Sequence, residues 1–204
     1  MIRTDDSIDL GKALDILNHG GIVLSPTDTV WGLMCDFEGA AAINRIFEIK
    51  KSKPRPVAVL CDNFGRLDQI DIQFTAVAKR IAECFWPGPI TLVLKSNSKR
   101  ICCVSGENNA IGVRIPDCAD LIELIGDFGK PLAATSANHI GQNPPRELNE
   151  IPDDIISKVD FTCELKVTPS GLASTVVDCT SDKVSIIRQG EISLKDIQRV
   201  LDNS

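Results

Sequence analysis

Residues 21–33 read Gly-Ile-Val-Leu-Ser-Pro-Thr-Asp-Thr-Val-Trp-Gly-Leu, and the start of this stretch sets the pattern of the whole chain. The apolar run 22–25 predicts a short buried strand, which ends at Pro26 before the polar turn 27–29. Upstream, apolar residues at helical spacing predict a helix over 9–18, and Gly20-Gly21 ends it. A helix, a strand and a polar loop in quick succession are typical of α/β proteins.

Helix and strand patterns continue to alternate along the rest of the chain. We expect helices over 40–50, 74–85 and 119–125, a helical turn within 151–159, and a final helix capped by Ser193 with Asp196 in the capping-box position. The expected strands are 57–61, 90–95, 101–104, 111–115, 131–135, 173–178 and 184–188. No internal repeat or linker interrupts this order, so we expect a single α/β domain over residues 1–204.

The composition is that of a globular chain without a chain-wide nucleic-acid surface. Of 204 residues, 43% are hydrophobic, and 22 basic against 28 acidic side chains give a net charge of −6. A local group of cations can still bind an anion, because net charge describes long-range steering rather than one cleft. Asp5 and Asp6 replace the basic start of a signal peptide, and no apolar run approaches the ~18 residues of a membrane span. We therefore expect a cytoplasmic protein with no membrane association.

Cysteine and histidine usage argues against a protein-bound metal. The eight cysteines are scattered singly except for Cys102-Cys103, no CxxC motif occurs, and the histidines are His19 and His139. Several cysteines lie in apolar or strand-like runs, where a free thiol behaves as a small buried hydrophobe. We expect structural cysteines and no zinc site.

Polar or cationic side chains recur where predicted strands meet loops. The sequence contains neither a P-loop nor a Rossmann fingerprint, but hydroxyl-rich segments occur at 27–29, 135–138 and 170–175. Arg114 and Arg188 lie in apolar strands, where each charge requires an internal carboxylate or a bound anion as its partner. Each feature alone is also explained by turn structure or an internal Asp. Together they predict a cleft lined with anion-binding donors.

Seven segments in the same order resemble the YrdC family, the threonylcarbamoyl-AMP synthases of tRNA modification. They are residues 21–33, 46–50, 86–92, 111–116, 131–138 with Gly141 and Pro144, 174–178, and 187–190. Collinear agreement over nearly the whole chain is a far more specific signal than any one segment. The resemblance is to the short form of the family.

This resemblance implies both a fold and a reaction. The fold is a YrdC/RibB-like α/β domain with a twisted mixed sheet, flanking helices and a concave basic cleft. The reaction is a nucleotidyl transfer in which L-threonine, bicarbonate or CO₂, and ATP give threonylcarbamoyl-AMP and pyrophosphate. A separate tRNA threonylcarbamoyl transferase complex is the implied downstream partner, and tRNA or double-stranded RNA is a further ligand of the fold's basic face.

The resemblance also implies roles for individual residues. Lys50, Arg114 and Arg188 are the implied catalytic residues, with Lys50 contacting the triphosphate and Arg188 near the nucleotide. Mg²⁺ is expected with the ATP phosphates, held by phosphate and water, because no carboxylate cluster of the usual type is visible. The implied substrate and ATP-binding residues are Thr27, Thr29, Lys53, Arg55, Thr135, Ser136, Asn138 and Ser174.

Two positions depart from the family pattern. The family's Lys-x-Arg reads Lys50-Lys51-Ser52, and Lys53 or Arg55 lies close enough in sequence to substitute for the missing arginine. A lysine supplies the charge but not the bidentate fork of arginine. His139 replaces a small polar residue, and we interpret it as a loop residue rather than a general base. Two alternatives to the synthase stay open: an RNA-binding protein with this fold, and a divergent relative that uses another acyl or carbamoyl substrate.

Overall fold

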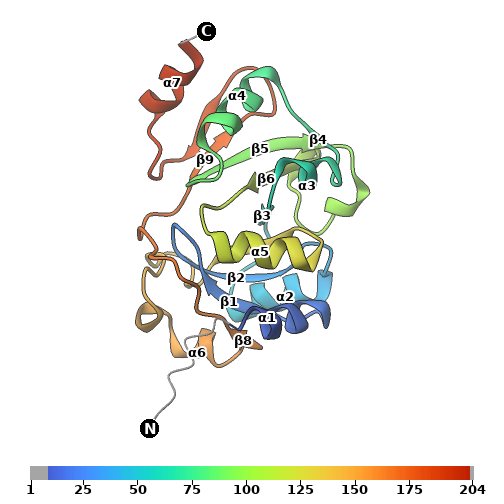
Figure 1. The fold of residues 1–204 in the computed structure, drawn as a ribbon, viewed down its shortest axis with the longest axis vertical. Helices are drawn as coiled ribbons and strands as arrows, with labels where there is room; N and C mark the ends of the chain where they lie inside the picture. The colour runs from blue at the N-terminus through green and yellow to red at the C-terminus, as the bar shows by residue number, and fades with distance from the viewer. Residues whose placement is uncertain (1–8, 203–204) are drawn as a thin grey trace.

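The protein folds as a twisted mixed sheet with helices packed on both faces (Figure 1). This computed structural model describes residues 9–202, so Asp5 and Asp6, on which the signal-peptide argument depends, lie outside the described residues. Within the described part, no helix is both long and apolar enough to cross a membrane. The predicted combination of a mixed sheet and flanking helices is confirmed.

The stretch 21–33 forms a β-hairpin. Strand β1 (Val23–Pro26) pairs antiparallel with β2 (Trp31–Asp36), and Pro26 lies opposite Trp31. The connecting loop is closed by Thr27, whose hydroxyl donates to the Val30 carbonyl oxygen at 2.8 Å and accepts from the Val30 N–H at 3.1 Å. Hydrogen bonds from a side chain to the backbone of its own loop stabilise the loop conformation.

The sheet combines antiparallel and parallel neighbours. Within residues 9–202 it has ten strands in the order β10-β9-β5-β6-β3-β7-β2-β1-β8, and β4 pairs with β5 outside this order. The pairs β3–β6, β5–β9 and β1–β8 are parallel, and the other pairs are antiparallel. The remaining strands are β3 (Ala58–Leu60), β4 (Ile72–Gln73), β5 (Ile90–Ser96), β6 (Ala110–Arg114), β7 (Leu132–Ser136), β8 (Phe161–Thr162), β9 (Thr175–Asp178) and β10 (Ser185–Arg188).

Two apolar clusters cover opposite faces of the sheet. Leu33 and Cys35 of β2 belong to the larger cluster, whereas Met34 between them belongs to the smaller one. Successive strand residues point to opposite faces, so the two clusters lie on opposite sides. Helices α2, α4 and α7 contribute to the larger cluster, and α1 and α5 to the smaller one. The helices are α1 (Leu10–Asn18), α2 (Ala40–Ile49), α3 (Phe64–Asp68), α4 (Ala76–Phe85), α5 (Ala119–Phe128), α6 (Asp153–Ile156) and α7 (Leu194–Asp202).

Local capping signals agree with the observed helix ends. The Asp9 side chain accepts from the Lys12 N–H at the start of α1, and Gly20 has a positive φ of 74° after its end. At α7, the Ser193 N–H donates to the Asp196 carboxylate at 3.1 Å, and the Ser193 hydroxyl accepts from the Asp196 N–H at 3.2 Å. This is the predicted capping box.

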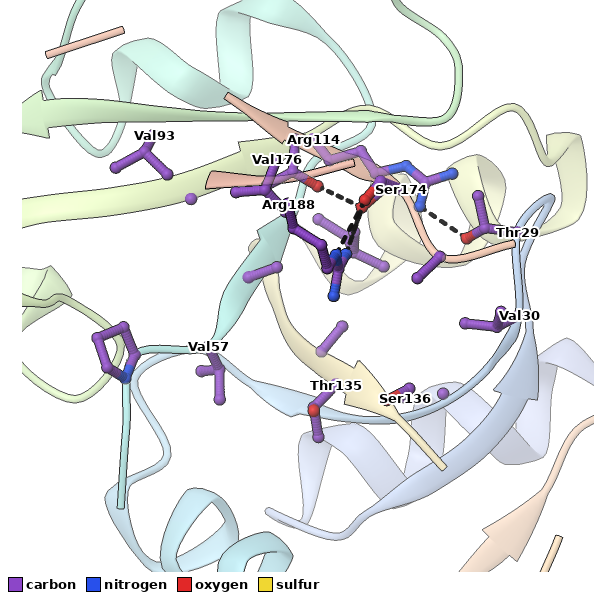
Figure 2. A pocket seen from close by; sticks show the side chains of 18 of the residues that line it. Thr29, Val30, Val57, Val93, Arg114, Thr135, Ser136, Ser174, Val176 and Arg188 are labelled. Carbon is purple, nitrogen blue, oxygen red and sulfur yellow. Dashed lines mark hydrogen bonds between the residues drawn. The ribbon is translucent and has the colours of Figure 1, made fainter. Parts of the chain in front are cut away.

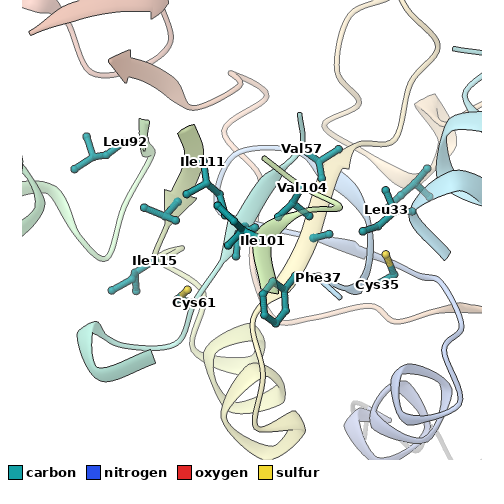
Figure 3. Packing of buried hydrophobic residues seen from close by; sticks show 14 of the residues in the cluster. Leu33, Cys35, Phe37, Val57, Cys61, Leu92, Ile101, Val104, Ile111 and Ile115 are labelled. Carbon is teal, nitrogen blue, oxygen red and sulfur yellow. The ribbon is translucent and has the colours of Figure 1, made fainter. Parts of the chain in front are cut away.

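One predicted strand is wrong. Residues 101–104 are not a strand, because Ile101 ends the short 3₁₀ helix Lys99–Ile101 and residues 102–104 form the turn after it. The Val104 N–H donates to the Ile101 carbonyl oxygen at 3.0 Å, and both side chains point into the larger cluster beside Ile111 (Figure 3). Ile101 and Val104, three residues apart, thus anchor a turn. In the sequence, the same short apolar run is typical of a strand, which explains the wrong prediction.

Other differences concern the extent of predicted elements and an element that was not predicted. The expected helical turn within 151–159 is limited to α6, which has four residues, and α5 continues past its predicted end to Phe128. Strand β2 was not predicted as a strand, because it is buried on both faces and shows no alternation of apolar and polar residues.

Candidate active site

A cavity of about 540 Å³ opens on one face of the sheet. Its floor is formed by alternate residues of neighbouring strands, such as Gly32 opposite Ser136 and Val93 opposite Gly112. These residues share the face of Met34, which is the face that α1 and α5 cover further along. The hollow therefore lies where that face is left uncovered by the helices.

Small residues make the hollow. Ala58, Ala110 and Ala134 line it, and Gly32 and Gly112 leave the strands bare at their centre. A Cβ at Gly112 would lie 3.2 Å from a methyl carbon of Thr91, so the sheet is closely packed there even without a side chain. A volume of this size lies in the range of small-molecule sites.

Arg114 forms one wall and is fully engaged. Its Nη2 lies 2.6 Å from both carboxylate oxygens of Asp28, its Nη1 donates to the Thr29 hydroxyl at 2.8 Å, and its Nε donates to the Gly88 carbonyl oxygen at 2.9 Å. Thr29 is in turn 2.9 Å from the hydroxyl of Thr27. Burial lowers the pKa of Arg114, and the Asp28 carboxylate opposes that effect. Of the two partners that the sequence left open for this arginine, the structure has the internal carboxylate.

Arg188 projects from β10 into the cavity (Figure 2). Its guanidinium donates to the carbonyl oxygen of Ser174 at 2.8 and 3.2 Å and to the Ser174 hydroxyl at 3.2 Å. That hydroxyl also lies 2.8 Å from the hydroxyl of Thr91. These contacts orient the guanidinium but leave its charge unneutralised, because within the described residues no carboxylate lies within ion-pair distance of it.

Arg55 supplies a second unneutralised charge. It lines the cavity, and across residues 9–202 it forms no ion pair with an acidic side chain. Burial first and then repulsion from Arg55 lower the pKa of Arg188. The lining residues, all within the described chain, include three arginines and no Asp or Glu. The cavity is therefore suited to an anionic ligand.

Lys50 lies behind the cavity rather than on its lining. Its ammonium donates to the carbonyl oxygens of Ser136 and Asn138, the latter at 2.5 Å, and the side chain is 2% exposed. Burial, followed by repulsion from Arg55, lowers the pKa of Lys50 to about 8. Lys50 thus fixes the backbone at the end of β7, and its charge contributes to the positive potential around the cavity.

The structure brings together most of the residues that the sequence singled out. Lys50, Lys53 and Asn138 are absent from the lining of the cavity. Asn138 is buried, and its amide group donates to the carbonyl oxygens of His139 and Gln142. The predicted residues that line the cavity are Thr27, Thr29, Arg55, Arg114, Thr135, Ser136, Ser174 and Arg188.

Sequence reasoning missed two polar residues of the site. Asp28 neutralises Arg114, and Thr91 holds the Ser174 hydroxyl. Asp28 lies between Thr27 and Thr29, which were predicted as site residues, and Thr91 lies in the segment 86–92 that resembles the family. Sequence position was therefore the signal that could have identified both residues. The small residues of the cavity floor could not be predicted as site residues, because alanine and glycine in a strand do not show which face of the sheet has a hollow.

The donor set does not fit a resident metal ion. Among the described residues, no group of three or more His, Cys, Asp or Glu side chains is suitably placed to hold one. Asp28, the carboxylate next to the cavity wall, is engaged by Arg114.

The fold and the site define a class: an α/β protein whose mixed sheet carries a cationic cavity for a small anionic ligand. The chain belongs to the Sua5/YciO/YrdC family, whose sequence profile, described as "Telomere recombination", matches residues 15–190. The resemblance to the YrdC family is thereby confirmed.

Curated relatives bear the name threonylcarbamoyl-AMP synthase. The protein from Pyrococcus abyssi is 30% identical over 190 residues, which cover 93% of this chain and 56% of the relative. The protein from Xanthomonas axonopodis pv. citri is 34% identical over 158 residues, which cover 76% of this chain and 84% of the relative. This chain thus spans a little over half the length of the Pyrococcus relative.

Solved structures agree with this assignment. Pyrococcus abyssi Sua5 in complex with L-threonine superposes with a TM-score of 0.85 at 29% identity, covering 94% of this chain and 57% of that chain. Escherichia coli YciO superposes with a TM-score of 0.82 at 25% identity, covering 92% of both chains.

Proposed function

We propose that this protein is an L-threonylcarbamoyladenylate synthase, which forms threonylcarbamoyl-AMP and pyrophosphate from L-threonine, bicarbonate or CO₂, and ATP. The observation that carries the proposal is the pair of unneutralised arginines, Arg55 and Arg188, on a cavity whose lining has no carboxylate. Carboxylated threonine and ATP are both anions and repel each other. Fixed cations offset that repulsion and stabilise the charge that develops as a carbamate oxygen attacks the α-phosphorus and pyrophosphate leaves.

The side chains divide into two groups under this proposal. Arg55 and Arg188 bind the phosphates, with the hydroxyl of Ser174 as an additional donor and Lys50 adding its charge from behind. Arg114 does not have a free guanidinium for a ligand, because its Nη2 donates to both carboxylate oxygens of Asp28. It therefore orders the wall formed by Thr27 and Thr29, against which the threonine moiety would lie.

The same proposal covers the partners and the setting. Mg²⁺ enters with ATP, and the product passes to a tRNA threonylcarbamoyl transferase complex. A single domain over residues 1–204 is part of the proposal, and the one continuous sheet within residues 9–202 supports it. A cytoplasmic location would suit a tRNA-modification enzyme of this kind.

The experiment is pyrophosphate release from ATP by the purified protein, with threonine and bicarbonate each omitted in turn. Release that requires both, together with the mass of threonylcarbamoyl-AMP, is the expected result. Arg188→Gln should reduce release strongly, whereas Arg199→Gln, which removes an exposed arginine of α7, should not. A folded protein that releases no pyrophosphate under these conditions would contradict the proposal.

The alternatives give different results in the same preparation. A divergent relative would release pyrophosphate only when threonine is replaced by another small amino acid or carbamoyl compound. An RNA-binding protein would bind tRNA without ATP or threonine, with an affinity that falls steeply with salt.

A further inference from the structure

The loop after α2 carries the cations that the cavity needs. We call residues 50–56 the cation loop, because it contains Lys50, Lys51, Lys53 and Arg55. Arg55 and Pro56 of this loop line the cavity, and Arg55 carries the charge. The loop also contains the Lys50-Lys51-Ser52 sequence in which the arginine of the family pattern is missing. Whatever holds this loop in place therefore determines where the Arg55 guanidinium lies.

The far part of the cation loop has few restraints of its own. The Ser52 N–H donates to the Phe47 carbonyl oxygen at 2.9 Å at its start, but within residues 53–56 the structure gives no backbone hydrogen bond. Pro54 and Pro56 have no N–H to donate. Repulsion acts on this segment, because the charge of Arg55 lowers the pKa of both Lys50 and Arg188. Without a ligand anion, that repulsion favours movement of Arg55 away from the cavity.

Contacts among three side chains hold the start of the cation loop. The Lys51 ammonium lies 2.7 Å from one carboxylate oxygen of Asp154 in α6, and His139 Nε2 lies 3.0 Å from the other. His139 Nδ1 lies 3.4 Å from the carbonyl oxygen of Lys50. Both ring nitrogens of His139 thus face oxygen acceptors, one on α6 and one on the cation loop. Lys51 first and then His139 lower the pKa of Asp154 to about 2, which keeps the carboxylate charged.

The backbone at Lys51 ends helix α2 in the left-handed conformation, with a φ of 51°. The Lys51 N–H donates to the Glu48 carbonyl oxygen at 3.0 Å and the Ser52 N–H donates to the Phe47 carbonyl oxygen at 2.9 Å, which is the Schellman pattern of a helix C-terminus. These backbone bonds account for the φ of Lys51. The ion pair to Asp154 adds a side-chain contact that ties this helix end to α6.

We propose that Lys51, Asp154 and His139 are positioning residues that hold the cation loop, and with it Arg55, over the cavity. They act on the affinity for the nucleotide phosphates rather than on the chemical step. This inference rests on the proposed function for its kinetic readout. His139, interpreted from the sequence as a loop residue, thereby gains a positioning role.

The first test is the effect of Asp154→Asn and Lys51→Met on nucleotide affinity and turnover. Each should raise the KM and the dissociation constant for ATP by about 2- to 5-fold, the equivalent of one exposed ion pair, and leave kcat unchanged. Lys51→Arg keeps the charge and should restore the affinity. The matched control is Lys79→Met, which removes a lysine paired with Glu83 on α4, away from the cavity.

A second test separates the side chain of Lys51 from its backbone. Lys51→Gly removes both the ion pair and the unfavourable φ. If the side chain positions the loop, Lys51→Gly should weaken ATP binding as Lys51→Met does. If the backbone conformation alone positions it, Lys51→Gly should bind ATP as tightly as the wild type, and the proposal would be overturned.

Hydrogen exchange of the peptide spanning 50–56 gives a readout that needs no turnover. Faster exchange in Asp154→Asn than in the wild type and in Lys79→Met is the expected result. If the wild type neither binds ATP nor releases pyrophosphate, the proposed function fails, and the exchange data still decide whether the three residues hold the loop. Equal exchange in all three proteins would refute the positioning role.

Discussion

Arg114 and Asp28 form a buried ion pair on the cavity wall, in which one guanidinium nitrogen lies 2.6 Å from both carboxylate oxygens. The pair separates the three arginines of the cavity into two kinds. Arg114 is neutralised within the protein, whereas Arg55 and Arg188 face the cavity without a carboxylate partner among the described residues. A ligand anion would therefore be recognised by Arg55 and Arg188, against a wall whose shape Arg114 maintains.

The first prediction concerns the stability of that wall. Asp28→Asn leaves the Arg114 charge buried without its partner, so the free energy of unfolding should fall by about 3–5 kcal/mol. Chemical denaturation measures the change. The control is Glu38→Gln, which breaks the part-exposed pairs with Arg100 and Lys130 and should cost about 1 kcal/mol. Equal losses in the two variants would contradict the assignment of Asp28 as the essential partner.

The second prediction concerns Arg188 as an anion receptor. Arg188→Gln removes a charge-assisted contact to phosphate, so affinity for ATP should fall by about 10- to 150-fold. Arg188→Lys retains the charge without the planar fork, so its affinity for ATP should lie between those of the wild type and Arg188→Gln. Isothermal calorimetry with ATP measures these affinities. If Arg188→Gln binds ATP as the wild type does, the nucleotide lies elsewhere.

The third prediction tests the junction that presents Arg188 and Ser174. A Cβ at Gly190 would lie 2.2 Å from the Ala173 carbonyl oxygen and 2.5 Å from the Thr175 nitrogen, both of them backbone atoms that cannot rotate away. Gly190→Ala should therefore lower the thermal midpoint and ATP affinity together. Gly11→Ala, in an exposed position of α1 with no atom nearer than 3.9 Å, should instead raise stability by about 0.5–1 kcal/mol.

Much of the fold follows from local sequence, and the failures have physical causes. The 9–18 helix was predictable from its apolar residues at helical spacing and the glycines that end it, and the final helix from its capping residue Ser193. Strand β2 was missed because burial on both faces removes the alternation that identifies a strand. Ile101 and Val104 were misread because a buried turn and a strand both require apolar residues.

The site was predictable to the extent that charge requires a partner. Arg114 in an apolar strand indicated either a carboxylate or a ligand, but Asp28 lies 86 residues away and the pairing depends on how the sheet is ordered. The ion pair of Lys51 with Asp154 depends in the same way on contacts between distant loops. Sequence therefore identifies residues that need partners, and the fold determines which partners they obtain.

The fourth prediction concerns stability at high pH. Burial raises the pKa of Cys35 and Cys179 to about 12 and that of Cys118 and Cys163 to about 11, from 9.0. Above pH 9 the unfolded chain loses these protons while the folded protein keeps them, so the free energy of unfolding should fall as pH rises from 9 toward 12. Each thiol contributes a slope of about 1.4 kcal/mol per pH unit.

Denaturation in reducing buffer at several pH values between 8 and 10.5 measures this slope. Cys179→Ala removes one buried thiol and should make the fall less steep, with Cys84→Ala as the control that removes an exposed thiol. An unchanged slope in Cys179→Ala would show that the thiol of Cys179 does not contribute to the loss.

The fifth prediction concerns Lys50, whose deprotonation should change protein stability and affinity for ATP in opposite directions. Its pKa is lowered by burial, and then by Arg55, from 10.5 to about 8. Between pH 8 and 10.5 the unfolded state binds more protons at this site than the folded state. The contribution of Lys50 to the free energy of unfolding should therefore rise across that window, by up to about 3 kcal/mol relative to Lys50→Met.

Affinity for ATP should change in the opposite direction, because the Lys50 charge that attracts phosphate is lost as pH rises through about 8. Lys50→Arg keeps its charge over this range, so its ATP affinity should decline less than that of the wild type. Paired denaturation and calorimetry between pH 7 and 10 measure both effects. Because one deprotonation drives them, a fall in affinity without the matching rise in stability relative to Lys50→Met would place the titrating group elsewhere in the site.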